Sequence, residues 1–304
     1  MTESGVISPV SRDCTTWRAA GAARFFSPAR PRRGMMPDMK KPRPPSLKIS
    51  ACVTAGNEED KIAACLASLQ WCDEIIVVDS YSKDRTFEIC KQYTPNVVQH
   101  PWEGYIAQKN YIRSLANHPW ILFVDADEVV SDELREEIEE EFERGPGETV
   151  GYQFPRMVHY LGKWIRHGEW YPDMKLRLFR KDCGYSGGQE PHDRVIVTGP
   201  VKTLKAPLHH FTYDDMSDHI NTLNRFSTIS AKQKAANGEP FRWRALLFRP
   251  PWRFFKSYFL KRGFLSGKQG FIVAYISAFG VFLKYAKLME IEQQRRAAEA
   301  QPTK

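Results

Sequence analysis

The sequence has few cysteines, and their spacing excludes several kinds of site. Its six cysteines include no C-x-x-C pair and no spacing typical of structural zinc. We therefore expect reduced, mostly buried thiols, as in a cytosolic protein. The N-terminus also has no apolar stretch of the signal-peptide type. Rich in Arg, Pro and Ser, residues 1–46 are interpreted as a disordered basic arm or as a mis-called start upstream of a later methionine.

Two signatures of other enzyme classes are also absent. The sequence contains no G-x-x-x-x-G-K phosphate-binding loop. No G-x-G-x-x-G follows the first predicted strand, which counts against a dinucleotide-dependent oxidoreductase. The chemistry must therefore come from another arrangement of side chains.

No apolar run is long enough for a predicted transmembrane span. The stretch around 271–283 is bounded by Lys268 and Lys284. As a helix, the uncharged residues between these lysines would span roughly 22 Å, short of a hydrocarbon core of about 30 Å. We expect this stretch to lie along a surface rather than to cross a bilayer.

Acidic residues are missing from one long segment. Residues 241–288 contain ten Lys and Arg but no Asp or Glu, whereas the whole chain has a net charge of +8. An acidic middle is therefore flanked by basic arms, which argues against nucleic-acid binding by the core, although the basic arms leave a nucleic-acid binder as an alternative. Aromatic residues among these cations favour membrane contact by residues 241–290 at an anionic cytoplasmic surface. The alternative is a helix packed on the core. We expect a disordered tail at 291–304.

The middle of the chain alternates between apolar runs and amphipathic segments. Predicted strands cover residues 48–54, 74–78, 96–99 and 120–124, and predicted helices cover 58–69, 84–93 and 105–116. Nearly continuous apolar strands between helices indicate an α/β fold, in which helices cover both faces of a mostly parallel sheet. After an acidic helix at 131–142 and a strand at 149–156, we expect a loop-rich acceptor region at 157–210 and a helix at 213–237.

Polar side chains follow three of the predicted strands. Thr54, Asp79 and Asp125 lie at strand ends, and Asp127 follows Asp125 by two residues. Ligands of open α/β sheets bind at the carboxyl ends of the strands. Residues i and i+2 of an extended chain point to the same side, so the two aspartates can share a Mg²⁺ or Mn²⁺ ion. The alternative is that Asp127 only caps the next helix.

Several motifs together resemble the family-2 glycosyltransferases. They are Val53 to Glu59, Ile75 to Ser80 with Ser82 to Thr86, Gln108-Lys109-Asn110, and Trp120 to Glu128. The resemblance implies a GT-A fold over residues 47–240. A weaker resemblance to the lipopolysaccharide-core β-glucosyltransferases that act on heptose is carried by Arg177 to Phe179, His192-Asp193, Leu208 to Tyr213 and Gly263 to Phe271.

The resemblance also implies roles for single residues of the donor half. Thr54 and Glu58 would line the nucleotide pocket, and Asp79 would contact the base or ribose. Lys109 would reach the donor's ribose or phosphates, and Asp125 would lie near the sugar and ribose. Asp127 would hold the metal against the diphosphate. His210 could complete the metal shell, although a lone histidine is more often structural.

A transferase that inverts its sugar in a single displacement needs a general base beside the acceptor hydroxyl. In the resemblance this is the acid of His192-Asp193, and Glu190 is the rival. We therefore expect a metal-dependent hexosyltransferase that moves glucose from UDP-glucose to a membrane-anchored glycan. The alternatives are a polyprenyl-phosphate sugar transferase and a non-catalytic membrane-surface module on the same scaffold.

Overall fold

The computed structural model describes residues 43–299, apart from residues 191 and 214. The predicted basic arm at 1–46 therefore lies almost wholly outside the described residues, as does the end of the predicted tail at 300–304. A short 3-10 helix, η1 (Pro45–Leu47), leads directly into the first strand.

The first half of the fold is a parallel α/β unit. Its strands are β1 (Ile49–Ala55), β2 (Glu74–Asp79), β3 (Val97–Gln99) and β4 (Trp120–Asp125), in the spatial order β3-β2-β1-β4. The helices α2 (Ile62–Ser68), α3 (Thr86–Tyr93) and α4 (Tyr105–Leu115) connect them. All four predicted strands and all three predicted helices are present.

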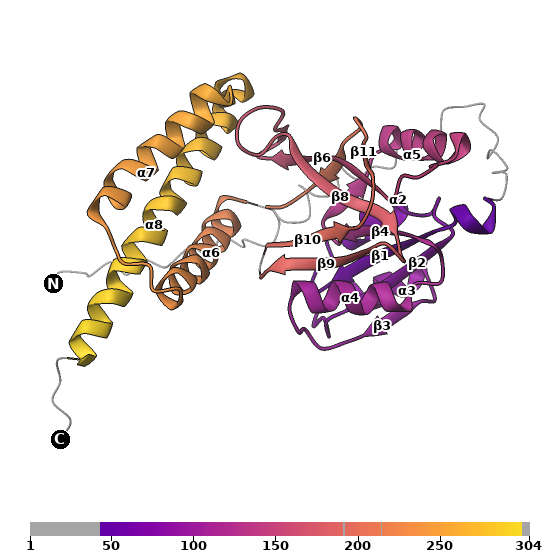
Figure 1. Cartoon of the computed structure of the whole chain (residues 1–304), viewed down its shortest axis with the longest axis horizontal. Helices are drawn as coiled ribbons and strands as arrows, with labels where there is room; N and C mark the ends of the chain where they lie inside the picture. Colours follow the sequence, from indigo (N-terminus) through magenta and orange to yellow (C-terminus); the bar gives the residue numbers. More distant parts are fainter. Residues whose placement is uncertain (1–42, 191, 214, 300–304) are drawn as a thin grey trace, which may run out of the picture. The chain divides into compact units, whose positions relative to one another are not determined.

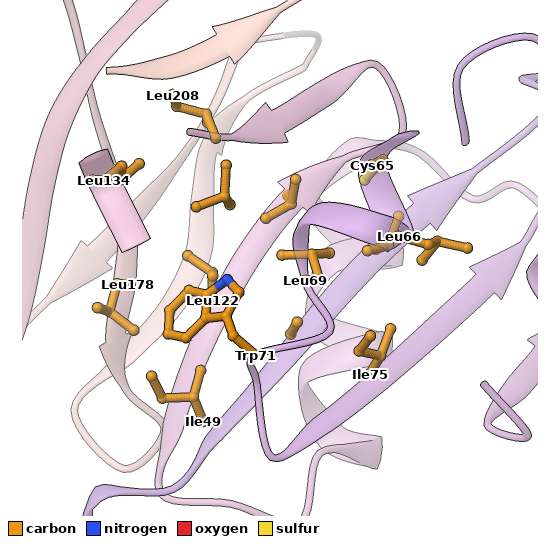
Figure 2. Close-up of a cluster of buried hydrophobic side chains, with 14 of the residues drawn as sticks. Ile49, Cys65, Leu66, Leu69, Trp71, Ile75, Leu122, Leu134, Leu178 and Leu208 are labelled. Carbon is orange, nitrogen blue, oxygen red and sulfur yellow. The ribbon is translucent and has the colours of Figure 1, made fainter. Parts of the chain in front are cut away.

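Alternation along the strands directs side chains to two cores, one on each face of the sheet. Leu122 packs with residues of α2, α3 and α5 (Asp132–Arg144), whereas its neighbour Phe123 packs with Ile112 of α4. Figure 2 shows the larger core, in which Trp71 lies among aliphatic side chains from several strands and α2. The prediction that helices cover both faces is confirmed.

The second half of the chain is richer in strands than we predicted. The region 157–210 was expected to be loop-rich. Instead it contains the end of β6 (Gly151–Tyr160), followed by β7 (Lys163–Trp164), β8 (Asp173–Arg180), β9 (Gly184–Gln189), β10 (His192–Val197), β11 (Val201–Thr203) and β12 (Leu208–His210). In β6 polar residues at partly buried positions interrupt the buried ones, and β11 is exposed throughout. They therefore lack the continuous apolar runs that identified the parallel strands.

These later strands extend the sheet beyond β4. The order continues β4-β8-β6-β12-β5, where β5 (Glu128–Val130) is the edge of the main path, and β7 and β11 pair with β6. β8 is antiparallel to both β4 and β6, and β12 is parallel to β6. β9 and β10 form a separate antiparallel hairpin. β8 pairs antiparallel with β4. Asp125, at the end of β4, therefore lies beside a residue from much later in the sequence, Arg177.

The C-terminal third is helical. It comprises α6 (Met216–Ala236), α7 (Trp243–Phe255), a π-helical turn η2 (Lys256–Leu260), a 3-10 turn η3 (Gly263–Ser266) and α8 (Gly267–Glu299). In Figure 1, α7 runs beside α8, and Ala231, Leu246, Tyr285 and Leu288 from α6, α7 and α8 share one small core. The domain boundary predicted at residue 240 therefore falls within a packed helical group, and the division stays a prediction.

The predicted disorder of 291–304 is wrong for residues 291–299, because α8 continues to Glu299. The side chain of Glu292 helps to stabilise this last part of α8. It accepts a hydrogen bond from the Phe241 backbone N–H and one from Arg296 a turn later. In the described part of the chain one helix, Gly263–Ala297, is long and apolar enough to cross a membrane, and a single such helix is weak evidence of a span.

Candidate active site

The polar residues predicted at strand ends meet at one edge of the sheet. In the register of β1 and β4, Thr54 lies directly beside Asp125. In the register of β1 and β2, Ala55 lies beside Asp79. Since all three strands are parallel, their carboxyl ends open on the same side, which is where α/β sheets bind ligands.

Asp79 is fully buried and organises the loop that follows β2. Its carboxylate accepts hydrogen bonds from the backbone N–H and hydroxyl of Ser82 and, at 3.0 Å, from the amide of Gln99. All these hydrogen-bond partners belong to the protein itself. A contact between Asp79 and a base or ribose therefore stays a proposal.

The turn after β1 is interlocked with the same loop. Asn57 adopts a left-handed conformation with φ of 58°, and its side-chain oxygen accepts a hydrogen bond from the Lys83 N–H at 2.9 Å. The next residue, Glu58, donates its backbone N–H to the hydroxyl of Thr86 at 2.7 Å. Asn57 therefore joins two loops rather than capping a helix. The turn places Glu58 three residues beyond the end of β1.

Lys109 joins the two acids on which the predicted chemistry depends. Its ammonium is almost buried and lies 3.1 Å from Asp125 Oδ1 and 3.0 Å from Asp193 Oδ2. Asp125 ends β4, whereas Asp193 lies near the start of β10. The structure thus brings the predicted base beside the predicted donor pocket. Pro191 and the side chain of His192, which precedes Asp193 in the motif, lie outside what the structure describes.

The neighbours of Lys109 fix its helix in place. On one side, Gln108 donates to the Ser80 hydroxyl at 3.0 Å in the loop after β2. On the other, Asn110 exchanges two hydrogen bonds with the backbone of Ser186 on β9, at 2.8 and 3.0 Å. The Gln108-Lys109-Asn110 motif therefore connects α4 to both the donor-side loop and the hairpin that carries Asp193.

Asp125 is held as a carboxylate by two cations. Burial alone would raise the pKa of Asp125, but Arg177 and then Lys109 reverse this effect and hold the pKa well below its usual range. The Arg177 guanidinium contacts Asp125 directly and lies 2.8 Å from Glu128. Both Asp125 oxygens pair with cations in this structure, and the predicted part of this aspartate in metal binding stays a prediction.

Sequence reasoning missed the network behind Asp125. Glu128 is fully buried and accepts the Asp125 backbone N–H at 3.0 Å, which fixes the turn that follows β4. Arg156 on β6 lies 3.2 Å from Glu128 and 2.8 Å from Asp173 on β8. No sequence spacing links these residues, because they meet only once β6 and β8 pair. The one sequence signal for this network was Glu128, an acid directly after the D-x-D motif of Asp125 and Asp127.

Asp127 lies in the turn between β4 and β5, so it does not share a strand with Asp125. The argument that residues i and i+2 point to one side therefore fails here. Instead, Asp127 Oδ2 lies 3.0 Å from Nε2 of His210, which β12 places opposite Glu128. Burial would raise the pKa of Asp127, but the nearby His210 lowers it overall. The backbone N–H of Phe211 also donates to the Asp127 carbonyl at 2.9 Å.

The donor set at Asp127 suits a divalent cation only in part. Among the residues that the structure describes, no group of three or more His, Cys, Asp or Glu is arranged to hold a metal. Asp127 and His210 supply two donors, and Nδ1 of His210 is buried without a hydrogen-bond partner in the described chain. Mg²⁺ and Mn²⁺ sites in enzymes often have few protein ligands and are completed by substrate phosphates and water. The pair of Asp127 and His210 fits such a site, while both oxygens of Asp125 already contact cations of the protein.

Glu190, the rival base, contacts the start of α4. Its Oε1 accepts the backbone N–H of Ile106 at 2.8 Å, which satisfies one of the free donors at the start of α4. The helix begins after Gly104, whose φ of 109° favours glycine, and a Cβ at that position would lie 2.9 Å from Glu190 Oε1. Glu190 therefore caps α4, and Asp193 is the acid next to Lys109.

Comparison with known proteins identifies the family of the chain. The family model described as glycosyl transferase family 2 matches residues 50–198. The chain is 32% identical over 265 residues to the lipopolysaccharide core biosynthesis glycosyltransferase LpsC of Rhizobium meliloti, covering 85% of this chain and 96% of that protein. It is 31% identical to an uncharacterized glycosyltransferase of Rickettsia typhi, covering 82% of this chain and 89% of that protein. The chain therefore belongs to glycosyltransferase family 2, and its fold is of the GT-A type.

Solved structures give more distant likenesses. Staphylococcus aureus TarS 1–349 in complex with UDP-GlcNAc has a TM-score of 0.43 at 15% identity, covering 83% of this chain and 92% of that chain. Glucosyl-3-phosphoglycerate synthase from Mycobacterium tuberculosis, in complex with Mg²⁺ and UDP, has a TM-score of 0.40 at 14% identity, covering 64% and 80%. Likenesses at this level transfer no residue roles.

Proposed function

We propose that the protein is an inverting hexosyltransferase that moves glucose from UDP-glucose to a membrane-anchored glycan such as a lipopolysaccharide core. The observation that carries the proposal is the chain of contacts from Asp125 through Lys109 to Asp193. It places an acid suited to deprotonate an acceptor beside the edge where the donor would bind. Membership of family 2 and the likeness to LpsC support the reaction class and the kind of acceptor.

On the donor side, we assign the nucleotide to the edge formed by β1, β2 and β4. Thr54 and Glu58 would line its pocket, and Asp79 would hold the loop against the base or ribose. Lys109 would offer its charge to the phosphates or ribose. Asp125, oriented by Arg177, would accept hydrogen bonds from the ribose or sugar hydroxyls. In this assignment the Asp125 carboxylate, held by Arg177 and Lys109, accepts hydrogen bonds in its present position. The buried network around it does not need to rearrange.

In the transfer step, Asp193 would take the proton of the acceptor hydroxyl while that oxygen forms a bond to the anomeric carbon. The bond between that carbon and the diphosphate oxygen breaks at the same time, and UDP leaves with the bonding electrons. Attack from the opposite face inverts the sugar. Ser186 donates to Asp193 Oδ2 at 3.4 Å and helps to orient the carboxylate.

We propose that Asp127 and His210 hold a Mg²⁺ or Mn²⁺ ion together with the donor diphosphate. Such an ion neutralises negative charge on the departing diphosphate. His210 is nearly buried, and β12 fixes its position against β5 and β6. The protein's part is thus to present one carboxylate and one imidazole at a fixed position beside the carboxyl edge of the sheet.

For the acceptor side, we propose that residues 241–290 dock on the anionic inner face of the cell membrane; they are called the docking segment below. Exposed apolar side chains occur all along it: Trp243, Leu247, Phe248, Trp252, Phe255, Phe259, Leu260, Phe264, Leu265, Phe271, Tyr275, Phe279 and Phe282. Cations interleave them without a single acid up to residue 288. Burial of such aromatics at headgroup level, with attraction of the cations to acidic lipids, favours peripheral binding.

Packing of α8 on α6 and α7 favours this orientation over a span. The Lys287 ammonium donates to the Asn224 carbonyl at 2.7 Å and to the hydroxyls of Ser227 and Thr228 on α6. A spanning α8 would take these polar groups into hydrocarbon, at a large cost. If α8 instead lies along the membrane surface, these polar groups stay within the protein and out of the hydrocarbon.

The function is tested by incubating the purified protein with a panel of nucleotide sugars and Mn²⁺ and measuring release of the nucleoside diphosphate. We expect slow hydrolysis of UDP-glucose above that of other donors, and loss of hydrolysis with EDTA. Absence of hydrolysis and of metal-dependent UDP binding would instead favour a non-catalytic membrane module on the same scaffold.

A further inference from the structure

A segment of the catalytic domain is attached to the docking segment. Residues 161–172, called the β6–β8 segment, connect β6 to β8 and contain β7. Gln269 donates to the Leu161 carbonyl at 3.1 Å, and Lys163 donates to the Ser266 carbonyl at 3.1 Å. The Ser266 hydroxyl in turn donates to the His167 carbonyl at 3.2 Å. Both ends of β7 are therefore fastened to the junction of η3 and α8.

Close backbone contact and an ion pair strengthen this attachment. The Gly168 N–H donates to the Lys261 carbonyl at 2.9 Å, and a Cβ on Gly168 would meet the Cα of Gly263 at 3.4 Å. Glu169 is largely buried and lies 2.5 Å from Arg253 Nε and 4.0 Å from Lys261 Nζ. It neutralises two cations of a segment that has no acid of its own nearby.

The outer surface of the β6–β8 segment has the same chemistry as the docking segment. From 161 to 168 it contains Lys163 and Arg166 but no acid. Leu161 is 40% exposed, and Lys163, Arg166 and His167 are exposed as well. Its one acid, Glu169, is turned inward to Arg253. Apolar and basic groups thus face solvent, and the negative charge does not.

We propose that the β6–β8 segment and the docking segment form one composite surface that binds an anionic phospholipid membrane. This proposal rests on the membrane-anchored acceptor of the proposed function and adds a part of the catalytic domain to the lipid contact. Charge complementarity selects acidic lipids, because both segments expose cations beside apolar side chains, and residues 161–172 and 241–288 expose no acid.

Ion pairs between neighbouring residues link the composite surface to the active site. The β6–β8 segment leads into Asp173, the first residue of β8, which pairs with Arg156 at 2.8 Å, and Arg156 pairs with Glu128 behind Asp125. At its other end, Ile165 shares a small core with Tyr160 of β6 and Val273 of α8. Lipid binding would therefore hold the acceptor side of the site at headgroup height.

The first test is hydrogen–deuterium exchange of the whole protein with and without vesicles of phosphatidylglycerol and phosphatidylcholine. We expect slower exchange in both the docking segment and residues 161–172, and no change in α3. Slower exchange in the docking segment alone would overturn the proposal, as would failure of the protein to bind these vesicles.

A charge-reversal variant gives the second test. Arg166→Glu changes an exposed side chain and should weaken vesicle affinity about 10-fold. Lys91→Glu on α3, with the same change in charge, should leave the affinity as in the unmodified protein. Equal affinities for Arg166→Glu and Lys91→Glu would contradict the composite surface.

A third variant separates attachment from charge. Glu169→Gln removes the ion pairs with Arg253 and Lys261, so residues 161–172 should lose their vesicle-induced protection while the docking segment keeps it. Glu239→Gln, which removes an exposed pair with Lys234, is the matched control and should behave as the unmodified protein.

Donor hydrolysis distinguishes the two proposals. Each variant above should hydrolyse UDP-glucose with Mn²⁺ at the unmodified rate. If the unmodified protein does not hydrolyse UDP-glucose, the proposed transferase activity is contradicted. The vesicle measurements do not depend on hydrolysis, so they decide separately whether the composite surface exists.

Discussion

The Lys109 ammonium lies 3.0 Å from the carboxylate of Asp193, although α5 and the strands β4 to β9 lie between α4 and β10 in the sequence. The same ammonium contacts Asp125 at 3.1 Å. One cation therefore relates the acceptor side of the site to the donor side. This relationship distinguishes Asp193 from the other acids of the hairpin region and underlies the first prediction.

Asp193→Asn should lower turnover about a hundredfold or more while UDP affinity stays nearly constant, because the variant removes a base that acts only in the transfer step. The measurements are steady-state kinetics with a membrane-anchored glycan and calorimetric titration with UDP.

Glu190→Gln is the control for this prediction. It weakens the cap of α4 and should cost about 1 kcal/mol of unfolding free energy, with a much smaller effect on turnover. If Glu190→Gln abolishes turnover and Asp193→Asn does not, the base has been misassigned.

The buried network around Arg177 should make a large contribution to stability. Arg177→Met keeps an apolar side chain but leaves Asp125 and Glu128 with one cation fewer, so we expect a loss of about 3–5 kcal/mol of unfolding free energy. Urea denaturation measures this change.

Arg180→Met is the matched control on the same strand. Its pair with Asp182 is solvent-exposed, and exposed pairs contribute about 0–1 kcal/mol. Similar losses in the two variants would show that the network around Asp125 is not buried as the structure describes.

The sequence was sufficient to predict the donor half of the fold. Strands such as β1 and β4 are buried almost throughout, so nearly every residue is apolar, and each strand stands out against its flanking helices. The positions of Thr54, Asp79 and Asp125 at one edge follow from parallel pairing alone.

The acceptor half was less predictable for a physical reason. β8 mixes charged and apolar residues and has only three consecutive buried positions, and β11 is exposed throughout, so neither has a continuous apolar run. Contacts such as that between Arg156 and Asp173 depend on the pairing of β6 with β8, which no local pattern encodes. The turn that separates Asp127 from β4 depends on the buried side chain of Glu128, whose role became visible only in three dimensions.

Stability should depend on pH through His219. Burial lowers the pKa of His219 to about 4, and its Nδ1 lies 2.7 Å from the Tyr160 hydroxyl. An unfolded histidine has a pKa near 6.5, so the unfolded state binds a proton first as pH falls. The unfolding free energy should therefore decrease from about pH 6.5 to about pH 4, by on the order of 3 kcal/mol for this group.

His219→Gln tests that assignment, because glutamine keeps a polar partner for Tyr160 without titrating. The variant should have a flatter stability profile between these pH values, measured by urea denaturation at each pH. A profile as steep as that of the unmodified protein would assign the effect to other groups.

Membrane binding should depend on the exposed aromatics of the docking segment. Phe248→Ser with Trp252→Ser removes two exposed rings from α7 and should weaken binding to vesicles that contain phosphatidylglycerol at least tenfold. Binding of the unmodified protein should also weaken as salt is raised, because the cations are exposed. Sedimentation with vesicles measures both effects.

Trp102→Ser removes an aromatic ring of similar exposure outside the docking segment and serves as the control. It should sediment with vesicles as the unmodified protein does. If it weakens binding as much as the α7 variant, the membrane-contact surface has been placed on the wrong part of the molecule.

The central claim is that Asp127 and His210 present a divalent cation to the diphosphate of a sugar nucleotide. Calorimetric titration of the protein with UDP, in Mn²⁺ and in EDTA, tests it most directly. We expect binding that requires Mn²⁺, is lost in Asp127→Ala, and is retained in Asp182→Ala, where an exposed acid distant in sequence is removed. Equal UDP affinity in Mn²⁺ and EDTA, or in Asp127→Ala and the unmodified protein, would contradict it.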